Sequence, residues 1–261
     1  MKSIVIIGSG NVAEALAKAF AKARGYDLLQ ISGRNEKRVK EISSAAGCGY
    51  AVAPAKPARA DIYIIAVSDR AIAEVAAGFN VGDSVVAHTA GSVGIEELSA
   101  AIKNRGALYP LQTFTAGREV NMAEVPLFVE GSNEYTAGIL KGLGAAISDS
   151  VRECGPEERM KLHMAAVFAC NFTNHLYVMA EEMLDETGIP RGVLKPLIRE
   201  TAAKAIAAKN AAFVQTGPAV RNDAPTMKKH LDLLAGCPQL QELYRIISSD
   251  IWETSKKISR K

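Results

Sequence analysis

Residues 8–13, GSGNVA, have the types and spacing of a turn that can hold phosphate groups, G-x-G-x-x-G/A. The first glycine permits the tight turn, and the second, Gly10, has no Cβ, so that the backbone can approach a pyrophosphate. The small Ala13 lets the next helix pack closely, and the N–H groups at its start face the phosphates. We expect a dinucleotide to contact Gly8, Ser9, Gly10, Asn11 and Val12.

The place of this motif in the chain makes it informative. The apolar run 4–7 before it is typical of a strand buried on both faces, and the Ala-rich segment 12–24 after it has helical apolar spacing. A strand, a glycine turn and a helix in this order indicate dinucleotide binding. The alternative is a structural glycine-rich turn without a ligand.

The end of the second expected strand bears on which dinucleotide binds. NAD-specific folds place Asp or Glu there to bind the ribose 2′-hydroxyl, but residues 30–35 read QISGRN and hold no carboxylate. Arg34 can pair with a 2′-phosphate through its planar guanidinium, and Ser32 and Asn35 can add hydrogen bonds. The sequence therefore predicts NADP(H) as cofactor. The alternative is that Arg34 is a solvated loop arginine.

Two more strand ends are expected to line the same crevice, because ligands bind beyond the carboxyl ends of strands in open α/β sheets. The first ends at VSD, residues 67–69, and the second at HTAGS, residues 88–92. We expect the cofactor to contact Ala66, Val67, Ser68, His88 and Thr89. For Asp69 an N-cap role is the alternative, and for His88 a hydrogen-bonded histidine at a strand end.

Apolar runs alternate with helix-like segments through the first part of the chain. The expected strands are 4–7, 27–31, 61–67, 83–87, 106–109, 126–131 and 147–153. The expected helices among them are 12–24, 36–46, 69–77 and 95–104. This alternation predicts the α/β class, with a doubly wound, mostly parallel Rossmann sheet.

The pattern becomes all-helical after residue 154. A proline at 156 and two acids after it begin a helix that runs to about residue 187. The further helices expected are 191–210, 224–234 and 238–257. We predict an NADP-binding Rossmann domain, 1–153, and a helical substrate and dimerisation domain, 154–261. Because about 110 residues cannot bury so much apolar helix alone, a homodimer through the C-terminal helices is expected.

Polar side chains interrupt the apolar sequence of the long helix. His163, Asn171, Asn174 and His175 lie within about one third of its circumference. Buried polar groups need partners, which a substrate would supply, so His163, Asn171 and His175 are candidate catalytic residues. The alternative is a hydrogen-bond network between helices.

Two further segments hold candidate substrate-binding residues. Tyr109 and Gln112 belong to YPLQTF, which follows a strand and could close over the nicotinamide or could be a rigid proline loop. Arg221 could bind a substrate carboxylate with both arms of its guanidinium. The alternative for Arg221 is an ion pair with Asp223 or another acid.

The composition excludes several classes of protein. A net charge of +3 does not indicate nucleic-acid binding, and no apolar run reaches the ~20 residues of a membrane span. The four cysteines form no CxxC pair, so no metal site is expected. The apolar N-terminal run is too short for an export signal, which favours the cytoplasm.

Several motifs resemble known families. Segments 8–16, 32–35 and 65–67 resemble the cofactor domain of pyrroline-5-carboxylate reductases and, more widely, of 6-phosphogluconate dehydrogenase-like and F420-dependent NADP oxidoreductases. Segments 88–92, 109–114, 163–171 and 216–223 are similar to a bacterial family of NADP oxidoreductases with a helical C-terminal domain of unknown function. The resemblance implies an NADP-binding domain and a helical dimerisation domain, and it supplies no substrate.

One departure from the relatives concerns the proton donor. β-Hydroxyacid dehydrogenases carry a lysine four residues before an asparagine on this helix, and if Asn171 is that asparagine, Val167 takes the lysine position. Proton donation then needs His163, His175 or a water, whereas an imine can arrive protonated. We expect an NADP(H)-dependent oxidoreductase that transfers hydride to or from a small anionic imine or hydroxy/keto acid. The alternative is a non-catalytic NADP(H)-binding or sensor protein.

Overall fold

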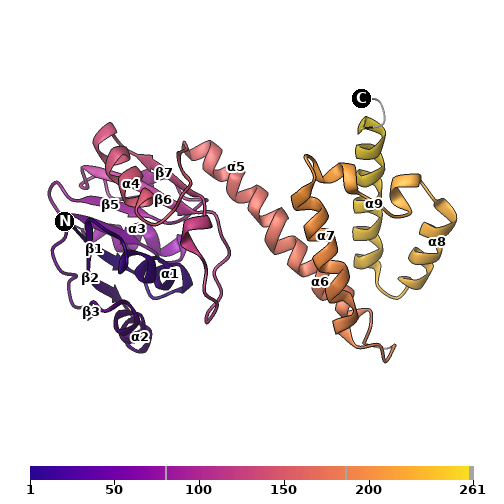
Figure 1. Cartoon of the computed structure of the whole chain (residues 1–261), viewed down its shortest axis with the longest axis horizontal. Helices are drawn as coiled ribbons and strands as arrows, with labels where there is room; N and C mark the ends of the chain where they lie inside the picture. Colours follow the sequence, from indigo (N-terminus) through magenta and orange to yellow (C-terminus); the bar gives the residue numbers. More distant parts are fainter. Residues whose placement is uncertain (80, 186, 259–261) are drawn as a thin grey trace. The chain divides into compact units, whose positions relative to one another are not determined.

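The computed structural model describes residues 1–79, 81–185 and 187–258 (Figure 1). The chain divides into two compact units, Met1–His175 and Leu176–Lys261, which we describe separately. The first unit holds the sheet, and the described part of the second is helical.

The first unit is built on one eight-stranded sheet of strand order β3-β2-β1-β4-β5-β6-β7-β8. All neighbouring strands are parallel except β6 and β7, which confirms the predicted Rossmann sheet. The strands are β1 (Lys2–Ile7), β2 (Tyr26–Gly33), β3 (Gly49–Val52), β4 (Ile62–Ile65), β5 (Val85–His88), β6 (Asn104–Pro110), β7 (Leu127–Gly131) and β8 (Val151–Glu153).

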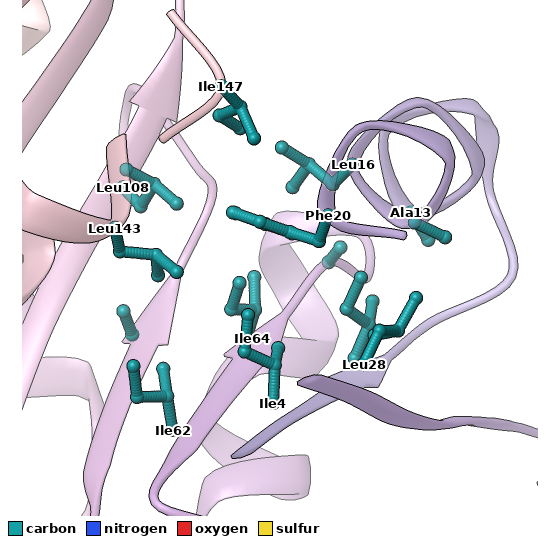
Figure 2. Close-up of a cluster of buried hydrophobic side chains, with 14 of the residues drawn as sticks. Ile4, Ala13, Leu16, Phe20, Leu28, Ile62, Ile64, Leu108, Leu143 and Ile147 are labelled. Carbon is teal, nitrogen blue, oxygen red and sulfur yellow. The ribbon is translucent and has the colours of Figure 1, made fainter. Parts of the chain in front are cut away.

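Helices pack on both faces of this sheet. One face buries side chains of α1 (Asn11–Phe20), α2 (Glu36–Ala46) and α4 (Glu134–Ala145), and the other buries α3 (Ile72–Ala77). Figure 2 shows Leu16 and Phe20 of α1 over Ile4 and Ile64 of the central strands. Burial of one such side chain stabilises the fold by about 1.5–3 kcal/mol, so this core fixes where β1 ends and α1 begins.

One predicted helix is absent and one observed helix was not predicted, each for a physical reason. Residues 95–104 form only a 3-10 turn, Ile95–Glu97, although Leu98 and Ile102 have the spacing of a helix face and are buried. The backbone at Leu98 is extended, so each of the two reaches the core from an irregular segment. Conversely, α4 contains three glycines, each of which disfavours a helix by about 1 kcal/mol, so its sequence does not predict a helix. The burial of Leu140 and Leu143 overrides that cost.

The long helix predicted from residue 156 is present. It comprises α5 (Pro156–Ala166), a π-helical turn (Val167–Phe172) and α6 (Thr173–Glu182), so it ends earlier than expected. The sheet ends at Glu153, where the domain boundary was predicted, but the compact first unit continues to His175. The reason is that side chains of α5 bond to β6, β7 and the segment after β5.

The second unit contains the remaining helices. They are a 3-10 turn (Arg191–Leu194), α7 (Lys195–Ala207), two 3-10 turns (Ala211–Val214 and Ala219–Arg221), α8 (Ala224–Leu233) and α9 (Pro238–Ile258). The predicted helices at 224–234 and 238–257 agree with α8 and α9. Among the described residues, no helix is long and apolar enough to cross a membrane.

Candidate functional site

A cleft of about 1120 Å³ opens in the first unit, at the carboxyl ends of the central strands. It brings together twelve of the predicted cofactor residues, which come from the ends of β1, β2, β4 and β5 and the starts of α1 and α2. These are Gly8, Ser9, Gly10, Asn11, Val12, Ser32, Arg34, Asn35, Ala66, Val67, Ser68 and Thr89.

The glycine turn lies at the centre of this cleft. Gly8 has φ +140°, and a Cβ there would lie 2.0 Å from the carbonyl oxygen of Ala66, so only glycine fits. A Cβ on Gly10 would meet no atom within 4 Å, so its lack of a side chain leaves open space beside the backbone. Among the described residues, no side chain caps α1 at Gly10, and the N–H groups at the start of the helix are free to bind an anion.

The end of β2 places the residues that are predicted to discriminate between dinucleotides on the cleft. Arg34 is exposed, and among the described residues its guanidinium has no hydrogen-bond or ion-pair partner. The nearby Arg38, by contrast, bonds to Glu14 at 2.6 Å and Glu41 at 2.8 Å. Asn35 caps α2, accepting from the N–H of Arg38 at 3.1 Å, and its amide nitrogen has no partner among the described residues.

Residues that sequence reasoning missed also line the cleft. Lys56 comes from the segment after β3 and adds a second cation to the cleft that Arg34 lines, while Glu74 and Phe79 come from the region of α3. The signal for Lys56 was weak because β3 has four residues and was not predicted as a strand. Without that strand, the loop that follows it had no predicted position.

The other end of the cleft holds candidate residues for chemistry. His163 of α5 and Asn171 of the π-helical turn line the cleft together with Gln112, Thr113 and Phe114. The side-chain amide of Asn11 donates to the carbonyl of Phe114 at 2.9 Å, which ties this loop to the glycine turn.

Tyr109 and Gln112, the two predicted substrate residues of β6 and its loop, differ in position. Gln112 lies on the cleft, where its side-chain oxygen accepts from the N–H of Thr113 at 2.8 Å. Tyr109 is 8% exposed and is not on the cleft wall; its hydroxyl bonds instead to Nδ1 of His163 at 3.1 Å.

His88, which the sequence predicts on the cleft, is not among the residues that line it. It is fully buried, and its Nδ1 accepts from the N–H of Ala90 at 3.2 Å. Burial, aided by the charge of Arg159, lowers its pKa to about 4, so the ring is neutral at pH 7. The other reading, a hydrogen-bonded histidine at a strand end, agrees with this geometry. For Asp69, by contrast, the alternative of an N-cap is wrong, because Ser68 holds the cap position. The Asp69 carboxylate accepts a hydrogen bond from the hydroxyl of Ser92.

The remaining candidates are not among the residues that line the cleft. His175 is exposed and ends the first unit, and Asn174 beside it is exposed too. Arg221 lies in the second unit, and it forms no ion pair with Asp223. The Asp223 carboxylate instead caps α8 through Thr226, at 3.2 Å to its N–H and 2.8 Å to its hydroxyl. Among the described residues, no group of His, Cys, Asp and Glu could hold a metal ion.

A mostly parallel sheet, with a glycine turn at a helix N-terminus and two cationic side chains in the same cleft, defines the class of dinucleotide-binding Rossmann proteins. Comparison with family models agrees. Residues 3–91 match the model described as NADP oxidoreductase, coenzyme F420-dependent, and residues 125–251 match a domain of unknown function, DUF2520.

A solved structure identifies the family. A candidate NADP oxidoreductase from Bacteroides fragilis is 38% identical over 97% of this chain and 98% of its own, with a TM-score of 0.88. The chain belongs to this family of NADP oxidoreductases, and its cofactor is NADP(H). A search of curated proteins found no match.

More distant structures share the fold. A 1-pyrroline-5-carboxylate reductase from Streptococcus pyogenes is 14% identical, with coverage of 98% of each chain and a TM-score of 0.63. An imine reductase from Streptomyces aurantiacus is 17% identical, with coverage of 100% of each chain and a TM-score of 0.64. At these identities the likeness shows the architecture and leaves the substrate open.

Proposed function

We propose that the protein uses NADPH to reduce a small, anionic imine or keto acid, or uses NADP⁺ to oxidise the corresponding hydroxy acid. The observation that carries this proposal is that one cleft joins the glycine turn to His163 and Asn171. The cofactor supplies the hydride, and the protein supplies orientation and polar contacts at the far end. Candidate roles there belong to His163 and Asn171.

Neutral polar side chains along the cleft suit an anion. Ser68, Thr89, Gln112 and Asn171 are neutral and can donate hydrogen bonds. Among the described residues that line the cleft, the one carboxylate is Glu74 of α3. Because pyrroline-5-carboxylate and imine reductases share the fold, we include imines among the candidate substrates.

The experiment that tests this proposal is a panel assay of NADPH oxidation. Purified protein is incubated with NADPH and cyclic imines, 2-oxo acids or, with NADP⁺, β-hydroxy acids. Turnover of at least one class is expected. The absence of lysine at Val167 supports a second candidate, an NADP(H) sensor, and tight NADPH binding with no turnover in any class would replace the first proposal by that one.

We also propose that the partner of the helical region is a second copy of this chain. The long helix exposes an apolar stripe with a spacing of four residues: Met160, Met164, Phe168 and Phe172, at 47%, 57%, 63% and 51% exposure. A continuous apolar stripe of this kind is characteristic of a protein interface. A two-fold dimer covers the same stripe on both chains at once.

The dimer proposal predicts that Phe168→Glu shifts the protein toward monomer by at least tenfold in dissociation constant, because a carboxylate would be buried in the interface. Sedimentation equilibrium measures this. Lys161→Gln, an exposed change of the same sign in charge on the same helix, is the control and should leave the dimer unchanged. A wild-type protein that is monomeric at micromolar concentration contradicts the proposal.

Location in the cytoplasm stays a prediction.

A further inference from the structure

Tyr109 and His163 form a pair between β6 and α5. The tyrosine hydroxyl lies 3.1 Å from Nδ1 of the histidine, and the ring centroids are 5.9 Å apart at an angle of 66°. Tyr109 is buried, whereas His163 is half-buried and lines the cleft. The two side chains therefore connect the core of the sheet with the place where a substrate is expected.

The direction of this hydrogen bond follows from what the hydroxyl can reach. Among the described residues, Nδ1 of His163 is the hydrogen-bond partner of the Tyr109 hydroxyl. Burial, with a smaller effect from the charge of Asp69, raises the pKa of Tyr109, so the hydroxyl keeps its proton. A buried O–H needs an acceptor. Tyr109 therefore donates to Nδ1, and the proton of a neutral His163 ring must be on Nε2.

Gly91 makes this close packing possible. A Cβ at Gly91 would lie 2.7 Å from Nδ1 of His163 and 2.8 Å from Cζ of Tyr109. These distances are too short for any side chain, so the segment after β5 leaves room for both rings. Because Nδ1 is taken by Tyr109, the free polar atom of the ring is Nε2, which has no partner among the described residues.

We propose that Tyr109 is a positioning residue that fixes His163 as the Nε2–H tautomer, and that this N–H binds an oxygen atom of the substrate. The ligand class is a carbonyl or carboxylate oxygen, since a fixed N–H donor is matched by an acceptor and opposed by the N–H of a protonated imine. This inference rests on the proposed function only for the substrate; the tautomer itself is independent of turnover.

Histidine nitrogen NMR tests the inference directly. The chain has four histidines, so protein labelled with ¹⁵N-histidine gives few signals, and His163→Gln assigns those of residue 163. Spectra are recorded at pH ~8, above the usual titration range of imidazole, where two-bond ¹H–¹⁵N correlations separate the tautomers. Wild type should show His163 with its proton on Nε2. Tyr109→Phe keeps the ring and should shift His163 to a mixture of both tautomers.

The matched control is Tyr63→Phe, which removes another buried tyrosine hydroxyl, one that bonds to the backbone at Ala58 and Ala60. It should leave the His163 signals in place, and thermal melting checks that each variant is folded. A wild-type His163 protonated on Nδ1, or an unchanged tautomer in folded Tyr109→Phe, overturns the inference. NADPH binding, measured separately on the same samples, reports on the proposed function.

Discussion

Replacing Arg34 with alanine is expected to weaken NADPH binding about 10- to 100-fold and to leave NADH binding within about twofold. Arg34 lines the cleft beside Ser32 and Asn35, and its guanidinium is not paired with another described side chain. A 2′-phosphate is the feature that distinguishes the two cofactors. The loss should therefore fall on NADPH alone, and titration of both cofactors by fluorescence or calorimetry measures it.

Arg38→Ala is the matched control for this experiment. Arg38 lies four residues further along, at the start of α2, but its guanidinium is held by Glu14 and Glu41. Its removal should change the affinity for NADPH less than twofold. Lys56→Ala, from the loop after β3, should produce a smaller NADPH-specific loss than Arg34→Ala, because a lysine is a point charge without the two-armed geometry of arginine. Equal weakening of NADPH and NADH by Arg34→Ala would exclude a 2′-phosphate contact.

The cofactor half of the cleft could be predicted because its signals are local. The fit of Gly8 and Gly10 depends on a strand, a turn and a helix that are adjacent in sequence, and the parallel sheet then brings Ala66 against the turn. The absence of a carboxylate after β2 is likewise visible in residues 30–35. These features can be recognised from short segments, without knowledge of the contacts that the rest of the chain makes.

The substrate half depended on contacts between distant segments. His88 is the last residue of β5, a position where ligand-binding residues are common in such sheets, yet the packing around β5 buries it completely. Tyr109 gains its partner from α5, 54 residues later, and Gly91 comes from a third segment. No periodicity or motif reports a bond between side chains so far apart, so the sequence makes Tyr109 a substrate-binding candidate and gives no sign of its contact with His163.

Replacing Arg159 with methionine is expected to lower the free energy of unfolding of the first unit by about 3 kcal/mol. Arg159 stands on α5, and its side chain is 1% exposed. One arm of the guanidinium pairs with Glu130 of β7, and the other donates to the carbonyl of Val93 at 2.6 Å. Methionine fills much of the volume but leaves a largely buried carboxylate without its cation.

Urea unfolding followed by circular dichroism measures this loss. Arg152→Met in β8 is the control, since Arg152 is exposed, and it should change stability by less than about 0.5 kcal/mol. The double variant Arg159→Met, Glu130→Met should regain at least about 1 kcal/mol relative to Arg159→Met, because no charge is then left unpaired. A single variant as stable as wild type would show that the pair adds nothing to the fold.

The same variant connects stability to the site. Arg159 lies four residues before His163 on α5, and Val93 lies two residues after Gly91, so the guanidinium ties together the two segments that hold the His163 ring. Weakening that tie should loosen the contact of Gly91 with Tyr109 and His163 before the sheet unfolds. In folded Arg159→Met, the His163 nitrogen signals should therefore show both tautomers, as in Tyr109→Phe. The affinity for NADPH should stay within about threefold of wild type, because Arg159 does not contact the glycine turn or Arg34. A single Nε2–H tautomer in this variant would mean that Tyr109 alone is enough to orient the ring.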